Sequence, residues 1–431
     1  DKMNSMSMGK RIIVAAGILL LAGALLMWWQ WPTLVRVLKG GAITLREPIL
    51  TVSPGSVIDH TYGFHPAIWG VFPDGEDADR VFDLAAEVGA PYMRMGFNRK
   101  WLNPREGEYQ WKMTDLAVER AKARGIKLTP SILFGNDDWA ARPIQRENRI
   151  YSVTSAVPAD LSTTWDSKNG YSKSVPAFYE AFLHRYPNTF PYIAIGNEPN
   201  AEKYWAGTYE EYIRVLQTAA QAIHRTDPTV RVIDGGIASE AWGCIAFDRV
   251  MSGVWSEKEG VDFLRTYFAA SRLGSQFQSA TDEQIIAYKN KPEIVAECEA
   301  REGYFKGLVG HVDAVNFHYY EGLDTLDDVI VYLQEKMKAN GWEDPVIVTN
   351  ELGNKQYKNP SYDVAGAQQA QDLRKKLELV TARGLPLIVW FSVNGEDTVT
   401  GGFLSTHAKD GTPYEAALEY RRFLEEQAQK N

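Results

Sequence analysis

The segment YMRMGFNRKWLNPREGEYQWKMTDLAVERAKARGIKL, residues 92–128, contains the pattern that decides the fold. It begins with an apolar run rich in β-forming residues and continues through a polar loop into a helical pattern at 115–125. That pattern ends on a glycine, as a helix C-cap would, and the next apolar run begins at 127. A strand, a helix and a second strand in this order indicate parallel strands joined by crossover helices.

The same alternation continues along the chain, and eight apolar runs are candidate strands: TYGFH (61–65), YMRMGF (92–97), KLTPSILF (127–134), YIAIGN (192–197), VRVIDGG (230–236), VDAVNFHYY (312–320), PVIVTNE (345–351) and PLIVWFS (386–392). Eight such units predict a closed (β/α)8 barrel rather than an open doubly wound sheet. The open sheet would suit a nucleotide, but the sequence has neither a phosphate loop nor a dinucleotide fingerprint. We expect the long stretch 240–305 to form an insertion near the barrel mouth.

Composition limits the possible function classes. The 431 residues include 46 Lys and Arg against 55 Asp and Glu, which gives a net charge of −9 and argues against nucleic-acid binding by bulk electrostatics. With 45% hydrophobic residues, the chain can build a large core. Cys244 and Cys298 could form one bridge in an exported protein or remain two buried free thiols. No cofactor motif or metal-ligand spacing is present, so we expect neither a cofactor nor a metal.

The N-terminal region contains an apolar run without charges from Ile12 to Val35. As a helix it would reach roughly 36 Å, which is enough to cross a hydrocarbon core of about 30 Å. A cleaved signal peptide would have small residues after the apolar core, whereas Trp28, Trp29 and Trp31 follow here and are typical of an interfacial belt. The expected division is a cytoplasmic segment 1–11, a transmembrane signal anchor 12–35, a linker 36–59 and a catalytic barrel 60–431. A cleaved signal and a buried soluble helix are the alternatives.

The first residues and the membrane orientation of this region lead to two further expectations. Asp1 and Lys2, which precede Met3, are typical of a tag remnant. The flanking positive charges do not decide the orientation. We place the barrel in the periplasm or outside the cell, with the anchor in a bacterial inner membrane, because of the function argued next.

Polar residues at predicted strand ends are the candidates for chemistry, because the active sites of such barrels lie at the C-terminal ends of the strands. These residues are Arg94, Asn197, Glu198, His318, Tyr320 and Glu351. Two carboxylates at one mouth are the minimum equipment for hydrolysing a glycosidic bond. One protonates the leaving oxygen, and the other attacks the sugar or activates water.

Three segments, IGNEPN (195–200), VNFHYY (315–320) and VTNELG (348–353), resemble the strand ends of clan A (β/α)8 retaining glycoside hydrolases, such as families 5 and 39. The segment 92–128 is similar to the opening of that clan, and the resemblance covers roughly residues 60–400. It implies that Glu198 is the acid/base and Glu351 the nucleophile. It also implies that Arg94 and Tyr320 hold Glu351, that Asn197 contacts the sugar 2-hydroxyl, and that His318 positions this group.

Each assignment has a simpler alternative. A glutamate before proline can merely favour a helix N-terminus, and Arg94 could be a structural ion-pair partner. Asn350 and Leu352 depart from the clan's usual pattern beside the nucleophile, which leaves an inactive homologue open. If Glu198 and Glu351 are not the catalytic pair, other carboxylates near strand ends are the replacements, namely Asp137, Asp138, Glu321, Glu396 and Asp397. Trp390 is the preferred platform for a sugar ring, and other tryptophans of presumed mouth loops are Trp69, Trp101, Trp139 and Trp205.

Together these observations predict a membrane-anchored retaining glycoside hydrolase that acts on a polysaccharide or oligosaccharide. An anchor suits trimming of the cell's own exopolysaccharide beside a synthase or export complex. The alternatives are a non-catalytic glycan-binding or scaffold subunit of such a complex, and a transglycosylase.

Overall fold

The computed structural model describes residues 61–65, 76–135, 139–143, 155–269, 278–354, 363–393, 405–408 and 410–430. The predicted segments 1–11, 12–35 and 36–59 therefore lie outside the described residues, as do Trp69, Asp137, Asp138, Glu396 and Asp397. Among the helices within the described ranges, none combines the length and the apolar character that crossing a membrane requires.

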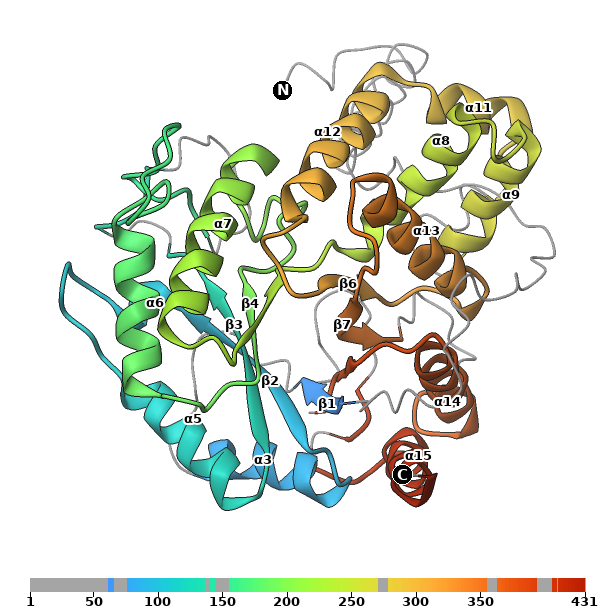
Figure 1. Ribbon diagram of the computed structural model, residues 1–431. Coiled ribbons are helices and arrows are strands. Elements are labelled where there is room, and N and C mark those ends of the chain that lie inside the picture. Colours follow the sequence, from blue (N-terminus) through green and yellow to red (C-terminus); the bar gives the residue numbers. More distant parts are fainter. Residues whose placement is uncertain are drawn as a thin grey trace, which may run out of the picture.

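Eight parallel strands form the centre of the molecule (Figure 1). Their order is β5-β4-β3-β2-β1-β8-β7-β6, and isolated bridges from Ile233 to Ala314 and from Ile237 to Phe317 connect the two end strands. The predicted (β/α)8 barrel is thus confirmed as a nearly closed barrel. The strands are β1 Thr61–His65, β2 Tyr92–Asn98, β3 Lys127–Leu133, β4 Tyr192–Ile195, β5 Arg231–Asp234, β6 Val315–Tyr319, β7 Ile347–Gly353 and β8 Leu387–Phe391.

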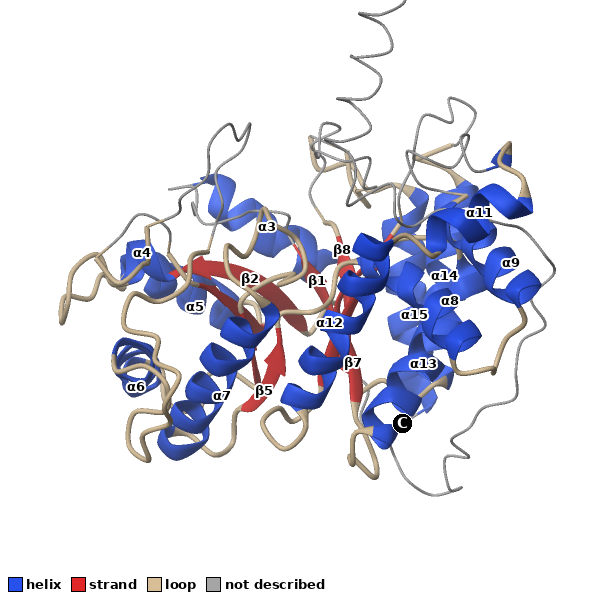
Figure 2. Cartoon of the chain, turned by 90° about the horizontal axis from the view of Figure 1, so that it is seen from above, coloured by secondary structure: helices blue, strands red, loops and turns tan. Residues whose placement is uncertain are grey.

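Helices surround this barrel, as Figures 1 and 2 show from two directions. They are α3 Glu76–Glu87, α4 Arg99–Leu102, α5 Lys112–Ala123, α6 Ser174–Arg185, α7 Tyr209–Thr226, η1 Ser239–Gly243, α8 Cys244–Met251, α9 Glu257–Phe268, α11 Asp282–Lys289, α12 Pro292–Leu308, η2 Leu323–Thr325, α13 Leu326–Ala339, α14 Ala367–Ala382 and α15 Glu415–Lys430. Gly125 follows α5 with a φ of 68°, so the cap predicted from the sequence is present.

The strands divide their side chains between two apolar layers. Tyr192 together with small and branched residues fills the barrel interior, and a larger cluster fills the space between strands and helices. On β8, for example, Leu387 and Val389 belong to the interior, whereas Ile388 and Trp390 belong to the outer cluster. This alternation decides which residues at each strand end can reach the mouth.

The described residues of the stretch between β5 and β6 include η1 and the helices α8, α9, α11 and α12. A disulfide bond joins Cys244 at the start of α8 to Cys298 in α12, so of the two alternatives left open by the sequence the structure has the bridge. Close to this bridge, the indole of Trp242 in η1 donates a 3.1 Å hydrogen bond to the backbone oxygen of His318. The inserted helices therefore contact the strand that carries a candidate site residue.

We expect the double variant Cys244→Ser/Cys298→Ser to have a lower free energy of unfolding by about 2–4 kcal/mol. The bridge closes a loop between residues 54 positions apart, and removing it returns entropy to the unfolded chain. Urea unfolding of the variant and the oxidised wild type measures the difference, and reduced wild type is the matched control. An unchanged midpoint would contradict this structural role.

Candidate active site

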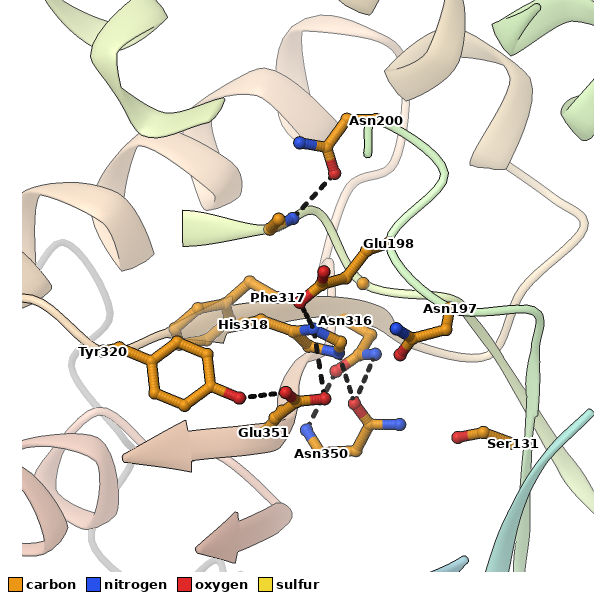
Figure 3. A network of polar contacts seen from close by, with 12 residues as sticks. Ser131, Asn197, Glu198, Asn200, Asn316, Phe317, His318, Tyr320, Asn350 and Glu351 are labelled. Carbon is orange, nitrogen blue, oxygen red and sulfur yellow. Dashed lines mark hydrogen bonds and ion pairs between the residues drawn. The ribbon is translucent and has the colours of Figure 1, made fainter. Parts of the chain in front are cut away.

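One extra residue in β7 brings two neighbouring side chains to the barrel mouth. Asn316 of β6 pairs with Val348 and His318 pairs with Glu351, so two steps on β6 match three on β7. The register to β8 shifts in the same place. This is a β-bulge, which changes the direction of the side chains that follow it. As a result Asn350 and Glu351 both contact polar residues of the mouth (Figure 3).

Arg94 of β2 contacts this group and is completely buried. Its Nε donates to Ser131 Oγ at 2.9 Å, its Nη2 donates to Asn197 Oδ1 at 2.6 Å, and its Nη1 donates to Glu351 Oε2. Three strands are therefore connected through one guanidinium. Its fixed fork orients Glu351 and supplies the positive charge that an ionised buried carboxylate requires.

Tyr320 binds the other oxygen of the same carboxylate, because its hydroxyl donates to Glu351 Oε1. Burial raises the pKa of the Tyr320 hydroxyl well above its ordinary value, and the charges of Glu351 and Glu198 raise it further. Tyr320 therefore stays a hydrogen-bond donor throughout the neutral range. Both oxygens of Glu351 therefore accept hydrogen bonds, one from Arg94 and one from Tyr320.

Glu198 follows β4 on a tightly turned backbone. Its φ is 38°, a left-handed value that a residue with a side chain rarely adopts. The backbone N–H of Glu198 donates to Gly235 O at 3.0 Å, and its own carbonyl accepts from Ala201 N at 2.8 Å. Local strain of this kind is concentrated at functional sites. The turn directs the Glu198 carboxylate toward His318, whose Nδ1 lies 2.9 Å from Glu198 Oε1.

The structure brings both predicted carboxylates to one place. One side-chain atom each of Glu198, His318 and Glu351 lies within 4.8 Å of the other two. Such a set could in principle hold a metal, and it comes from β6, β7 and the turn after β4, so no sequence spacing could reveal it. The Arg94 guanidinium already binds Glu351, however, and a divalent cation would have to compete with it. The arrangement suits acid/base chemistry better than metal binding.

Asn197 offers a free hydrogen-bond donor beside these carboxylates. Its side chain is 2% exposed, its Oδ1 accepts from Arg94, and its Nδ2 has no hydrogen-bond partner among the residues that the structure describes. In Figure 3 the amide points toward the polar group formed by Glu198, His318 and Asn350. A buried donor without a partner costs free energy unless a ligand satisfies it.

Trp390 lies apart from this group. It is 0% exposed and packs in the outer cluster, because alternation along β8 turns it toward the helices. In this structure it therefore presents no open ring face to a sugar. The next residue, Phe391, instead packs edge-on against Tyr320 with ring centroids 5.6 Å apart. Counting alternate residues from Leu387 would have selected Phe391.

The other tryptophans differ in exposure. Trp101 is 37% exposed and Trp139 is 38% exposed, whereas Trp205 is buried. Sequence reasoning also missed Tyr204, in the loop after β4. Burial raises the pKa of its hydroxyl well above the ordinary value, and the charges of Glu198 and Glu351 add to the increase. Its position a few residues after the NEP motif was the available signal.

No family model and no curated protein matches this chain. Solved structures with a similar fold include a family 39 glycoside hydrolase from Bacteroides cellulosilyticus WH2 (TM-score 0.50, 15% identity, 85% of this chain and 63% of that one). Another is an exo-β-1,4-mannosidase from Opitutaceae bacterium strain TAV5 (TM-score 0.52, 15% identity, 86% of this chain and 60% of that one). A third is a family 39 enzyme from Xanthomonas axonopodis pv. citri (TM-score 0.51, 15% identity, 90% of this chain and 68% of that one). The chain spans less than two thirds of the first two, and at these identities the likeness concerns the fold.

Proposed function

We propose that the chain is a retaining glycoside hydrolase with Glu351 as nucleophile and Glu198 as acid/base. The convergence of the two carboxylates carries this proposal, because their closest oxygens lie within 4.8 Å. Retaining enzymes hold their carboxyl groups about 5–5.5 Å apart, whereas inverting enzymes leave about 6.5–9.5 Å for a water. The fold shared with family 39 enzymes agrees with this chemistry.

The surroundings of each carboxylate suit its proposed role. Arg94 and Tyr320 keep Glu351 ionised and aimed, so that it attacks the anomeric carbon while Glu198 gives its proton to the departing oxygen. Water then attacks the same carbon, the bond to Glu351 breaks, and Glu198 takes a proton from that water. The side chain of Glu198 is 13% exposed against 6% for Glu351, which fits its exchange of protons with leaving group and water.

The Nδ2 of Asn197, which has no partner among the described residues, supports a contact with the substrate. Its Nδ2 can donate to the 2-hydroxyl of the sugar in the proposed reaction, and such a bond strengthens in the transition state. The bond from Arg94 to Asn197 Oδ1 fixes which end of the amide points outward. Substrate binding would thus satisfy a donor that has no partner among the described residues.

We further propose that residues 12–35 anchor the enzyme in a bacterial inner membrane with the barrel outside the cytoplasm, where it trims an exopolysaccharide near its synthase or exporter. The disulfide between Cys244 and Cys298 supports an oxidising compartment. Cell fractionation of the full chain and of a variant without residues 12–35 tests the anchor. Equal recovery of both in the soluble fraction would exclude it.

Trapping the covalent intermediate tests the reaction. In Glu198→Ala, an aryl glycoside with a good leaving group should still glycosylate Glu351, but water attack should slow by about 10²–10⁴-fold. Mass spectrometry should then find the sugar ester on the peptide that contains Glu351. An added sugar acceptor distinguishes transfer from hydrolysis. If the wild type turns over no substrate of a broad polysaccharide and aryl glycoside panel, the scaffold alternative replaces the enzyme.

A further inference from the structure

We infer that a relay of hydrogen bonds, from the backbone oxygen of Asp234 through the side chains of Asn316 and Asn350, fixes the tautomer of His318 so that its Nδ1 accepts the proton of Glu198. Glu198 and His318 then act as one acid that shares a single mobile proton. This inference deepens the proposed function and names positioning residues for the same site. Groups that can only donate and groups that can only accept determine the direction of each hydrogen bond in the relay.

The backbone fixes the orientation of Asn316. The backbone N–H of Asn350 can only donate, and it lies 2.9 Å from Asn316 Oδ1. The carbonyl oxygen of Asp234 can only accept, and it lies 3.1 Å from Asn316 Nδ2. Both contacts require the same assignment of the Asn316 amide, so its Nδ2 is the donor.

The polarity then continues to the histidine. Asn316 Nδ2 donates to the side chain of Asn350 at 2.8 Å, so the atom of Asn350 that it meets is the acceptor, Oδ1. His318 Nε2 lies 2.8 Å from that same oxygen. Nε2 must therefore carry a hydrogen, and in a neutral ring Nδ1 must be bare. The bare nitrogen is the one that faces Glu198 Oε1 at 2.9 Å.

A ring turned by 180° would place carbon atoms where Nδ1 and Nε2 now meet Glu198 and Asn350, so the polar contacts select this orientation. His318 is completely buried, and its backbone N–H donates to Ile237 O at 3.0 Å. Gly236 adopts a φ of +75°, and a Cβ at that position would lie 2.4 Å from His318 Nε2. The base of the relay is equally constrained, because Asp234 accepts from the backbone N–H of Asn316 and from the hydroxyl of Tyr304.

One proton therefore has two places in this pair. It can sit on Glu198 beside a neutral His318, or on Nδ1 of an imidazolium beside the Glu198 carboxylate. In the proposed reaction it leaves with the glycosidic oxygen in the first step and returns from water in the second, so the count balances. The titratable and charged groups around this contact are Glu351, Arg94, Tyr320, Tyr204 and Asp234.

Nitrogen-15 NMR of the full chain with labelled histidine tests the inference directly. Seven histidines are present, and His318→Gln identifies the signals that belong to His318. We expect Nε2 to carry its hydrogen in both the neutral and the protonated ring, so that only Nδ1 gains and loses one. A neutral ring with its hydrogen on Nδ1 and a bare Nε2 would overturn the inference. Because this measurement needs no turnover, its result is independent of whether the protein is a glycosidase.

Two variants of Asn350 test the relay. Asn350→Asp keeps the acceptor and adds a negative charge next to Nε2. The pH at which Nδ1 is half-protonated should therefore be about 1–3 units higher than in the wild type. The basic limb of the activity profile should move in the same direction. Asn350→Leu removes the acceptor, and signals of both tautomers should appear. A variant that keeps the wild-type tautomer and titration would remove Asn350 from the relay.

Asn200→Asp is the matched control for charge. Asn200 is near the same mouth, and its Oδ1 accepts from Ala238 N at 2.8 Å, which an aspartate can also do (Figure 3). It adds the same charge without touching His318. We expect its effect on the Nδ1 titration to be several-fold smaller than that of Asn350→Asp. Equal shifts would show a general field effect and overturn the relay. Circular dichroism confirms that each variant is folded.

Discussion

Glu351→Gln should lower kcat by about 10⁴-fold or more while the affinity for substrate changes little. The amide has nearly the same shape as the carboxylate, but it cannot form the bond to the anomeric carbon. The partners of Glu351 explain why binding should survive. Tyr320 can still donate to the amide oxygen, and Asn197 keeps its bond from Arg94. A loss in kcat without a loss in binding separates a reacting group from a structural one.

Single-turnover kinetics and binding of an oligosaccharide by calorimetry measure the two effects separately. Glu321→Gln is the matched control, because Glu321 is also a buried carboxylate near the end of β6 and is one of the alternative carboxylates that the sequence offers. Its side chain accepts from Tyr320 N at 3.2 Å rather than facing Glu198. If Glu321→Gln abolished turnover and Glu351→Gln did not, the assignment of the nucleophile would be wrong.

Arg94→Met should be the most destabilising single change at the site, by about 3–5 kcal/mol. It leaves Glu351 as a buried carboxylate without its countercharge, and it removes the donors to Ser131 and Asn197. The activity should fall as well, since Glu351 and Asn197 both lose their orientation. Urea unfolding and kcat/KM measure the two losses.

Two further substitutions give this result its meaning. Arg94→Lys restores a positive charge but not the planar fork, so stability should recover more than activity. Arg185→Met is the surface control, because Arg185 is 51% exposed and its pair with Asp115 should contribute about 0–1 kcal/mol. If Arg94→Met were no more costly than this control, the guanidinium would not hold the site together.

The eight strands and their order around the barrel could be predicted because each strand is a short β-rich run and helices between them, such as α7, have an apolar face. Glycines such as Gly125 marked the helix ends, since a positive φ is needed there. Strand ends then identified Arg94, Glu198, His318, Tyr320 and Glu351, which the structure brings together. The local residue pattern and the topology of the barrel were enough to predict the strands, the helix ends and these site residues.

Other features depend on register, which the residue pattern did not reveal. The bulge at Asn350 changes no hydrophobic pattern, so the relay through Asn316 was invisible, and Asn350 seemed only a departure from the clan motif. Trp390 was selected as an aromatic residue at a strand end, although its position in the alternation turns it outward. The bridge between Cys244 and Cys298 depends on how α8 and α12 pack, which composition does not determine.

The bulge in β7 has a wider consequence for how such a scaffold acquires chemistry. A regular strand gives only every second side chain to a cavity, so eight strands offer few places at any one depth. One additional amino acid gives β7 two adjacent places, and Asn350 and Glu351 fill them with different tasks. A single inserted codon at a strand end can thus add a functional group to an existing barrel while the helices around it stay where they were.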